Sequence, residues 1–318
     1  MRALVVGGAG FIGRPICRRL LALGWDVWVA DNLAIRPEEP IPDGVRFHWA
    51  DVRYYSQIVL ALEVSKPDVL FWLAAHQGYG PDWKWFGSVN IVSAYALAEA
   101  LREADAAGRP VRRVVLASSQ AVYAPGMQVH EDHPKVPTSV YGLSKWQQEQ
   151  AFEHFARAGG PPTVALRPSI VLGRGQAVQS SESGVLRNWA RAALAGRRPE
   201  IYGTGEHVRD FVHVEDVARA FVRAAQQAPG GTRAPFVALN LGGPSMSLLE
   251  LARRFQVAWG GSLEPEVLGR EIRPGGEFSM TSDPSAAWEA LGGWVPGLGI
   301  EQQVGDFVAG VRAAGDSR

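Results

Sequence analysis

The chain has 318 residues, of which 47% are hydrophobic and 20% charged, and its 32 Lys and Arg residues balance its 32 Asp and Glu residues. This length suits one large α/β domain, or one domain with a smaller lobe. The sequence has no basic stripe that would suggest nucleic-acid binding and no acidic tail that would suggest disorder, so we expect no nucleic-acid partner. The single cysteine, Cys17, excludes a disulfide framework and a cysteine-based metal cluster, so we expect no metal site.

No apolar run reaches the roughly 18 residues of a membrane span. Met1 leads straight into a predicted strand, so we expect no signal or transit peptide. We therefore expect a soluble, cytoplasmic protein with no membrane partner.

The first predicted unit is a strand, a glycine turn and a helix. The apolar run Ala3–Val6 predicts a strand buried on both faces, and residues 14–23 have helical spacing. Glycines between them let the backbone approach a pyrophosphate at a helix N-terminus, although a plain glycine-rich turn is the alternative. Asp31, at the end of the next strand, favours dinucleotide binding. The candidate cofactor residues of this turn are Gly7, Gly10, Phe11, Ile12 and Gly13.

Strand-like and helical stretches alternate along the chain, which predicts a doubly wound, Rossmann-like parallel sheet of about seven strands. The predicted strands are 2–6, 26–30, 45–49, 68–73, 113–118, 163–167 and 236–240. The clearest helices are 14–23, 54–64, 88–107 and 141–157, and a further helix is expected at 185–195. We assign residues 1–168 to a dinucleotide-binding domain with later contributions near 212–241, and residues 169–318 mainly to a smaller substrate-binding lobe.

Ligands of such a sheet bind at the carboxyl ends of the strands, so the residues that follow each strand are informative. Asp31 and Asn32 can bind ribose hydroxyls, and a carboxylate there favours NAD over NADP, although Arg36 keeps NADP open. Asp51, before Val52, either caps the next helix or binds the adenine amine. The small residues after the fourth strand let the backbone pass close to the cofactor, and they form the candidate segment Leu73, Ala74 and Ala75.

An aromatic stretch, 79–86, precedes the helix 88–107. It is either a hydrophobic loop packed on the core or on another subunit, or an aromatic wall beside the substrate, with Tyr79 as a substrate contact. Asn90, early in the following helix, is expected to hold that helix against the loop after the fourth strand and to lie at the cofactor site.

The fifth strand ends in two hydroxyl residues, Ser118 and Ser119, which we expect to face the pocket. Further along, Tyr141 and Lys145 lie four residues apart and share one face of a predicted helix. An ammonium group and a cationic nicotinamide both favour a phenolate, so Tyr141 is the candidate general base. In this interpretation Ser119 fixes the substrate hydroxyl and Lys145 holds the ribose.

With these motifs in this order, the chain resembles the extended short-chain dehydrogenase/reductase family, in its nucleotide-sugar epimerase/dehydratase branch. The resemblance continues in the second half, through Gly203–Gly205, Arg209–Asp216, Asn240–Gly242 and Arg273–Gly275. It implies NAD as cofactor, a nucleotide sugar as substrate, and contacts of Arg209 and Arg273 with the substrate diphosphate. It also implies a lid within 174–198, and a homodimer in which helices 88–107 and 141–157 form a four-helix bundle.

The resemblance further implies inversion of one sugar carbon, most often C4, through transient oxidation and re-reduction on the other face. Dehydratases of the family carry acidic residues after the hydroxyl of the fifth strand, whereas this chain has Gln120, a candidate substrate contact, and Ala121. This favours a 4-epimerase, with a keto-sugar reductase or dehydratase as the alternative and a non-catalytic cofactor-binding protein as a minor one. Ile170 stands where many relatives have a substrate-binding Asn.

Overall fold

A seven-stranded parallel sheet forms the centre of the protein. The computed structural model describes residues 1–35, 37, 39–78, 82–178, 184–227, 234–261, 264–269 and 278–316. The strand order in the sheet is β11-β7-β5-β4-β1-β2-β3. The bounds of these strands are β1 Arg2–Val6, β2 Asp26–Asp31, β3 Arg46–Trp49, β4 Val69–Trp72, β5 Arg113–Ala117, β7 Thr163–Pro168 and β11 Phe236–Leu241.

The seven predicted strands are confirmed, each within one residue at either end. The reason lies in burial: on β1, Ala3 and Val5 point into one core while Leu4 and Val6 point into the other. Both faces of the sheet are therefore covered, as a continuous apolar run predicts.

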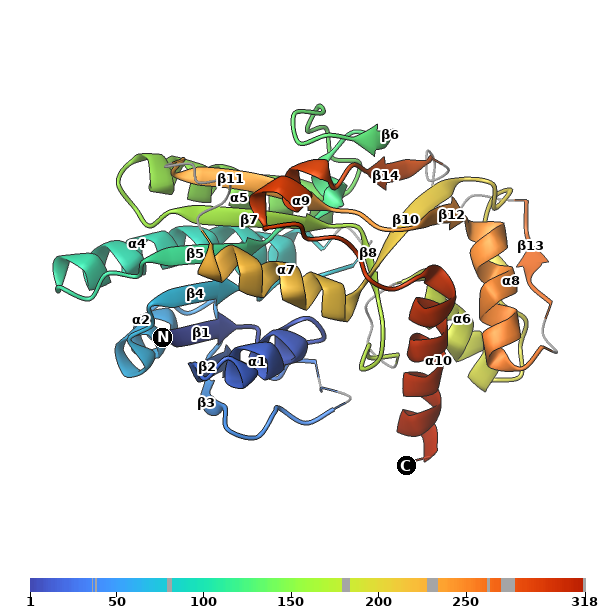
Figure 1. Cartoon of the computed structure of the whole chain (residues 1–318), viewed down its shortest axis with the longest axis horizontal. Coiled ribbons are helices and arrows are strands. Elements are labelled where there is room, and N and C mark those ends of the chain that lie inside the picture. The colour runs from blue at the N-terminus through green and yellow to red at the C-terminus, as the bar shows by residue number, and fades with distance from the viewer. Residues whose placement is uncertain are drawn as a thin grey trace.

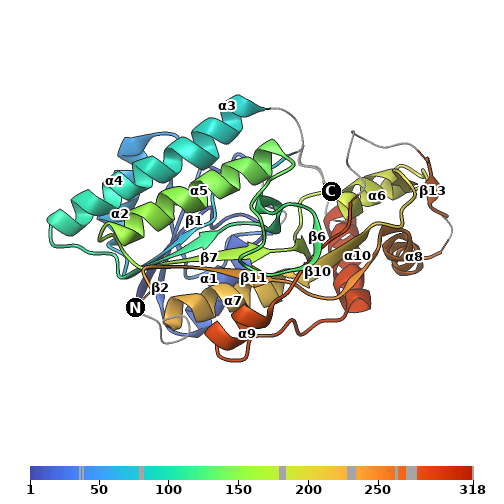
Figure 2. The same ribbon diagram turned by 90° about the horizontal axis from the view of Figure 1, so that it is seen from above.

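Helices cover the two faces of the sheet in separate layers (Figure 1 and Figure 2). One layer packs on the core that contains Ala3, and it consists of α1 Gly13–Ala22, α7 Val214–Gln226 and α9 Ser285–Ala290. The other packs on the core that contains Leu4, and it consists of α2 Tyr55–Ser65, α4 Ser93–Ala106 and α5 Val140–Arg157. From β1 the chain continues to β2 on one side of it, whereas β4 lies on the other side, so the direction of the strand order reverses between β1 and β4. Sheets of this kind bind ligands at such a reversal.

A second group of elements lies beyond the carboxyl ends of the central strands (Figure 1). Its sheet has the order β12-β10-β14-β6, with β8 paired to β10, and α6, α8 and α10 pack beside it around Trp189, Phe255 and Phe307. The bounds are β6 Gly126–Val129, β8 Ile170–Leu172, α6 Val185–Leu194, β10 Val208–His213, β12 Ser245–Ser247, α8 Leu248–Trp259, β14 Met280–Ser282 and α10 Ile300–Asp316, and the short strands β9 Glu200–Ile201 and β13 Glu266–Val267 pair with each other.

The predicted helix 88–107 is wrong in one respect, because it is not a single regular helix. It consists of a short turn α3 Trp83–Trp85, a π-helical segment η1 Phe86–Val92 and then α4. Asp82 caps the first turn by accepting a hydrogen bond from Trp85 N at 3.4 Å. π-Helical turns occur mostly as single insertions at functional positions, and this one carries Asn90. In the described part of the chain, no helix combines the length and the apolar character that crossing a membrane requires.

Candidate functional site

The glycine turn after β1 is fixed by close backbone contacts. Gly7 has a positive φ of +81°, and a Cβ there would lie 2.6 Å from Ala74 N. A Cβ on Gly13 would lie 2.6 Å from the Cα of Gly8, so the turn folds on itself only with glycine at these places. Ile12, the N-cap of α1, makes no side-chain hydrogen bond to the first helical turn. The backbone N–H groups at the start of α1 therefore have no capping side chain, and such a helix start fits the pyrophosphate of a dinucleotide.

Asp31, at the end of β2, braces that turn. Its Oδ2 accepts a hydrogen bond from Ala9 N at 3.0 Å, and its Oδ1 accepts one from Leu33 N at 2.8 Å. Burial raises the pKa of Asp31 above its ordinary value. Each carboxylate oxygen retains a second lone pair, so the side chain can also accept a ribose hydroxyl. Arg36, the residue that kept NADP open, lies outside the described residues.

Asp51 does not cap the next helix, because α2 begins after Tyr54. Its carboxylate is instead held by Arg53 Nε at 2.9 and 3.0 Å from the two oxygens, and by Asn32 Nδ2 at 3.2 Å. The hydrogen bonds from Arg53 lower the pKa of Asp51. The Arg53 guanidinium in turn lies 4.5 Å from the ring centroid of Trp85. The sequence analysis missed Arg53, whose only signal was its place two residues after Asp51.

The segment after β4 passes directly behind the glycine turn. Leu73 N and Ala74 N both donate to Val6 O, at 2.9 and 3.0 Å. At His76, two residues further on, the backbone N donates to Asn90 Oδ1 at 2.7 Å, and the backbone O accepts from Asn90 Nδ2 at 3.0 Å. This placement agrees with the prediction that Asn90 ties its helix to the loop after the fourth strand. Ala75 lies between the hydrogen-bonded residues Ala74 and His76. Val52 is buried in the core that also contains residues of β1 and β4.

The described residues of the aromatic stretch differ in burial. Trp83 is 61% exposed, whereas Phe86 is buried and lies between two other rings. The Phe86 centroid is 4.8 Å from that of His76 and 6.3 Å from that of Tyr141. Tyr79, the predicted substrate contact of this stretch, lies outside the described residues.

The start of α5 packs tightly against the end of β5. Ser139 Oγ caps α5 by accepting from Gly142 N at 3.0 Å, and a Cβ at position 142 would collide with the Ala121 carbonyl oxygen. This contact brings Tyr141 to the turn η2, Gln120–Val122, whose N-cap is Ser119. Ser119 Oγ accepts from Ala121 N at 3.2 Å and is half-buried. The fold therefore brings Ser119 and Tyr141 to the same end of the sheet.

Lys145 lies one turn after Tyr141, with only 2% of its surface exposed. Its Nζ donates to Ala117 O at 2.8 Å and to Gln148 Oε1 at 3.1 Å. Burial lowers the pKa of Lys145 to about 7. Its ammonium group thus stands at the carboxyl end of β5, close to the predicted base.

Ser118 does not face the pocket, which corrects the expectation for this residue. Its Oγ donates to Glu149, which forms a buried ion pair with Arg167 at 2.6 Å. The Arg167 side chain also donates to the hydroxyl of Tyr123. The sequence analysis did not single out Glu149, although its spacing of four from Lys145 places it on the same helix face.

Of the predicted substrate residues, Arg209 lies on β10 of the second sheet, and Gln120, in the turn η2 after β5, contacts that sheet. Gln120 Oε1 accepts from Ser282 Oγ at 3.1 Å, and Ser282 N donates to Asp210 Oδ2 at 3.0 Å. Burial raises the pKa of Asp210 to about 7. The neighbouring Arg209 lies with its guanidinium carbon 4.5 Å from the ring centroid of Phe278. Arg273, the second arginine expected at the diphosphate, lies outside the described residues.

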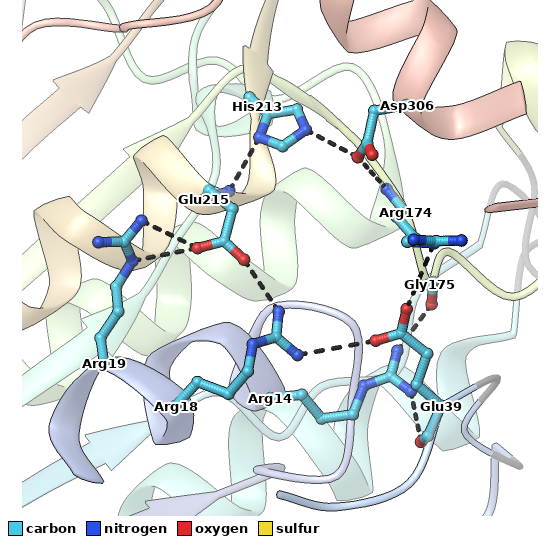
Figure 3. A network of polar contacts seen from close by, with 9 residues as sticks. All are labelled: Arg14, Arg18, Arg19, Glu39, Arg174, Gly175, His213, Glu215 and Asp306. Atoms are coloured by element: carbon cyan, nitrogen blue, oxygen red, sulfur yellow. Dashed lines mark hydrogen bonds and ion pairs between the residues drawn. The ribbon is translucent and has the colours of Figure 1, made fainter. Parts of the chain in front are cut away.

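A polar network ties the glycine-turn helix α1 to the second group of elements (Figure 3). Arg14 donates to Glu39 O at 2.7 Å and to Gly175 O at 2.8 Å. Glu215, at the start of α7, pairs with both Arg18 and Arg19 at 2.9 Å. The network continues from His213 Nε2 to Asp306 Oδ2 on α10 at 3.0 Å. The cofactor end of α1 is thereby anchored to segments that follow β8 and β10.

The fold and this site define a dinucleotide-dependent enzyme of the Rossmann type. The chain belongs to the NAD dependent epimerase/dehydratase family, which it matches over residues 3–242. It is 34% identical to the UDP-glucose 4-epimerase of Mycolicibacterium smegmatis, with 97% of each chain covered. The predictions of the family, of NAD as cofactor and of an enzyme of the epimerase class are confirmed.

Solved structures of relatives support the same assignment. The chain is similar to a UDP-glucose 4-epimerase of Thermus thermophilus in complex with NAD, with 30% identity, a TM-score of 0.86, and 99% of this chain and 100% of that chain covered. It is also similar to a UDP-glucose 4-epimerase of Thermotoga maritima with UDP-glucose, with 27% identity, a TM-score of 0.86, and 98% and 99% covered. The predicted α/β fold is confirmed.

Proposed function

We propose that the protein interconverts UDP-glucose and UDP-galactose by inversion at C4. The observation that carries the proposal is the placement of Ser119, Tyr141 and Lys145 at the carboxyl end of β5, while the segment after the neighbouring strand β4 packs against the glycine turn. The relatives named above are UDP-glucose 4-epimerases, and this chain matches them over nearly their full length. This similarity supports the choice of sugar and carbon.

The residues around the glycine turn fit NAD, because Gly7 and Gly13 let the turn fold tightly at the start of α1, where free backbone N–H groups suit a pyrophosphate. NAD, when bound, supplies the acceptor and donor of a hydride. In the proposal Asp31 binds the adenosine ribose, and Lys145 and Tyr141 bind the ribose next to the nicotinamide. The full set of proposed cofactor residues is Gly7, Gly10, Phe11, Ile12, Gly13, Asp31, Asn32, Asp51, Val52, Leu73, Ala74, Ala75, Asn90, Tyr141 and Lys145.

The chain's own residues move the proton. Ser119 Oγ holds the C4 hydroxyl of the sugar, and the Tyr141 phenolate takes its proton. The Lys145 ammonium favours the phenolate because it lies one helical turn away in a buried site. Tyr141 returns the proton after the sugar has presented its other face, so one carbon is inverted with no net redox change.

The substrate diphosphate is proposed to lie against Arg209 and Arg273, since guanidinium groups suit a pyrophosphate. Tyr79 and Gln120 are the further proposed contacts of the sugar. Gln120 is neutral and hydrogen-bonded to Ser282, so it offers no acid for elimination of water, which supports epimerisation over dehydration.

The assembly and the division of the chain are also part of the proposal. We assign cofactor binding to residues 1–168 with contributions from 212–241, and substrate binding mainly to 169–318. We propose a homodimer through α4 and α5, which lie side by side in Figure 2. Val92 at the end of η1 and Tyr95 on α4 are 57% and 59% exposed, which supports this face. Light scattering after gel filtration tests the dimer, and fractionation of the source cells tests the expected cytoplasmic location.

The activity is tested by incubating the purified protein with UDP-glucose and separating the products by anion-exchange chromatography. We expect UDP-galactose to form without consumption of added NADH. The Tyr141→Phe variant is expected to retain NAD and to lose turnover, whereas Tyr95→Phe, at an exposed position, is expected to keep both. Stoichiometric oxidation of NADH would instead indicate a keto-sugar reductase, and normal turnover by Tyr141→Phe would overturn the proposed role of this base.

A further inference from the structure

Gln148 is a completely buried polar side chain that the mechanism above does not use. It lies on α5 three residues after Lys145, and therefore on the same face of the helix. Its Oε1 accepts a hydrogen bond from Lys145 Nζ at 3.1 Å, and its Nε2 donates to Asn90 O at 3.0 Å. Both ends of the amide thus have a defined partner, which fixes which end is oxygen and which is nitrogen.

We propose that Gln148 is a positioning residue that holds the Lys145 ammonium between strand β5 and the π-helical segment η1, an inference that rests on the proposed function. Two acceptors fix the ammonium, Ala117 O from the strand and Gln148 Oε1 from the helix. An ammonium has three donors, so one N–H remains for the site. The direction of that third N–H is set by the other two.

Asn90, the hydrogen-bond partner of Gln148, also contacts other parts of the site. Asn90, which supplies the acceptor for Gln148 Nε2, also binds the backbone of His76 after β4 and donates to Ser144 Oγ at 2.9 Å. Ser144 Oγ donates to Tyr141 O at 2.8 Å. Gln148 therefore ties Lys145 to the backbone carbonyl of Asn90, the residue whose side-chain amide fixes the loop behind the glycine turn and contacts the first turn of α5.

The charged groups around Lys145 let the proposal be tested by titration. Glu149 faces it from the same helix and favours the charged form, and Arg167 on β7 neutralises Glu149 through their ion pair. Tyr141 lies one turn before it. Because Gln148 accepts a hydrogen bond from the charged form of Lys145, loss of that bond should disfavour the ammonium, and a carboxylate at position 148 should favour it.

The test is NMR titration of the protein as purified, with NAD, after selective labelling of lysine with ¹³C. The chain has only four lysines, at positions 66, 84, 135 and 145, and the spectrum of Lys145→Met identifies the signal of Lys145. We expect Gln148→Met to lower the midpoint of Lys145 by about one pH unit and Gln148→Glu to raise it. The control, Gln147→Met, is the same substitution one position earlier on the helix and is expected to leave the midpoint unchanged.

A structural role alone would lower the melting temperature without moving the midpoint of Lys145, and that result would overturn the proposal. If Gln148→Met does not fold, Gln148→Glu decides alone, since an unmoved midpoint in that variant also contradicts the proposal. The titration needs no turnover. An inactive wild-type protein whose Lys145 midpoint responds to Gln148 would contradict the proposed function and leave the contact itself confirmed.

Discussion

Removing one partner of the buried ion pair between Glu149 and Arg167 should cost far more stability than removing one partner of an exposed pair of this protein. The side chains of the two residues are 0% and 3% exposed, and their charged atoms are 2.6 Å apart. Replacing Glu149 by Ala leaves the Arg167 guanidinium buried without its carboxylate, which costs about 3–5 kcal/mol. The same change also removes the acceptor of Ser118.

The same helix offers a matched control. Glu153 pairs with Arg157 at 2.7 Å, almost the same distance, but these side chains are 34% and 66% exposed. An exposed pair at this spacing contributes about 0.3–0.5 kcal/mol, so Glu153→Ala should be nearly neutral. The two variants differ in burial and hardly at all in chemistry or distance.

Urea unfolding followed by circular dichroism measures the difference, at one fixed NAD concentration because bound NAD stabilises the folded state. With a slope of about 3 kcal/mol per molar urea, Glu149→Ala should unfold about 1 M earlier than Glu153→Ala. The double variant Glu149→Leu/Arg167→Met removes both charges and should recover most of the loss. Equal midpoints for Glu149→Ala and Glu153→Ala would refute the reasoning.

Two further predictions concern the glycine turn and the second sheet. Gly7→Ala should abolish NAD retention, measured as NAD released by acid, because its Cβ would collide with Ala74 N. Gly24→Ala is the control, since Gly24 has a similar φ of +74° but open space around a Cβ; equal NAD content in both variants would contradict the role of the turn. Asp210, whose pKa burial raises from 3.8 to about 7, binds its proton more tightly in the folded state, so it should make stability fall as pH rises from about 4 to 7. Asp210→Asn should remove that fall, by up to about 4 kcal/mol near pH 7, and a parallel pH profile of the melting temperature in both proteins would count against it.

The sequence predicts the central sheet well because its strands are buried on both faces and their apolar runs are short and bounded. It does not predict the second sheet, for a physical reason. There β6 pairs with β14, so Gly126 lies opposite Met280, and β8 pairs with β10 across some forty residues. These strands have three to six residues, too few for a periodic pattern, and their pairing depends on contacts distant in sequence.

In the candidate site, too, the local sequence predicts some features, whereas others depend on residues distant in the chain. Spacing along one helix predicts that Tyr141 and Lys145 share a face, and the structure places them so. Local sequence does not show which of two adjacent serines turns inward, because that depends on Glu149, a partner from another element. The π-helical insertion at Asn90 is likewise missed, since the residues of that stretch are also compatible with a regular helix.

One face of α5 therefore serves two purposes that constrain each other. Tyr141, Lys145, Gln148 and Glu149 follow each other at helical spacing, so the proton-transfer residues and the buried ion pair are rigidly connected. Glu149 alone would favour the charged form of Lys145, yet the pKa of Lys145 is lowered to about 7, with burial as the largest cause. Burial thus outweighs the attraction of Glu149, and the ammonium is left able to change its protonation state near neutral pH.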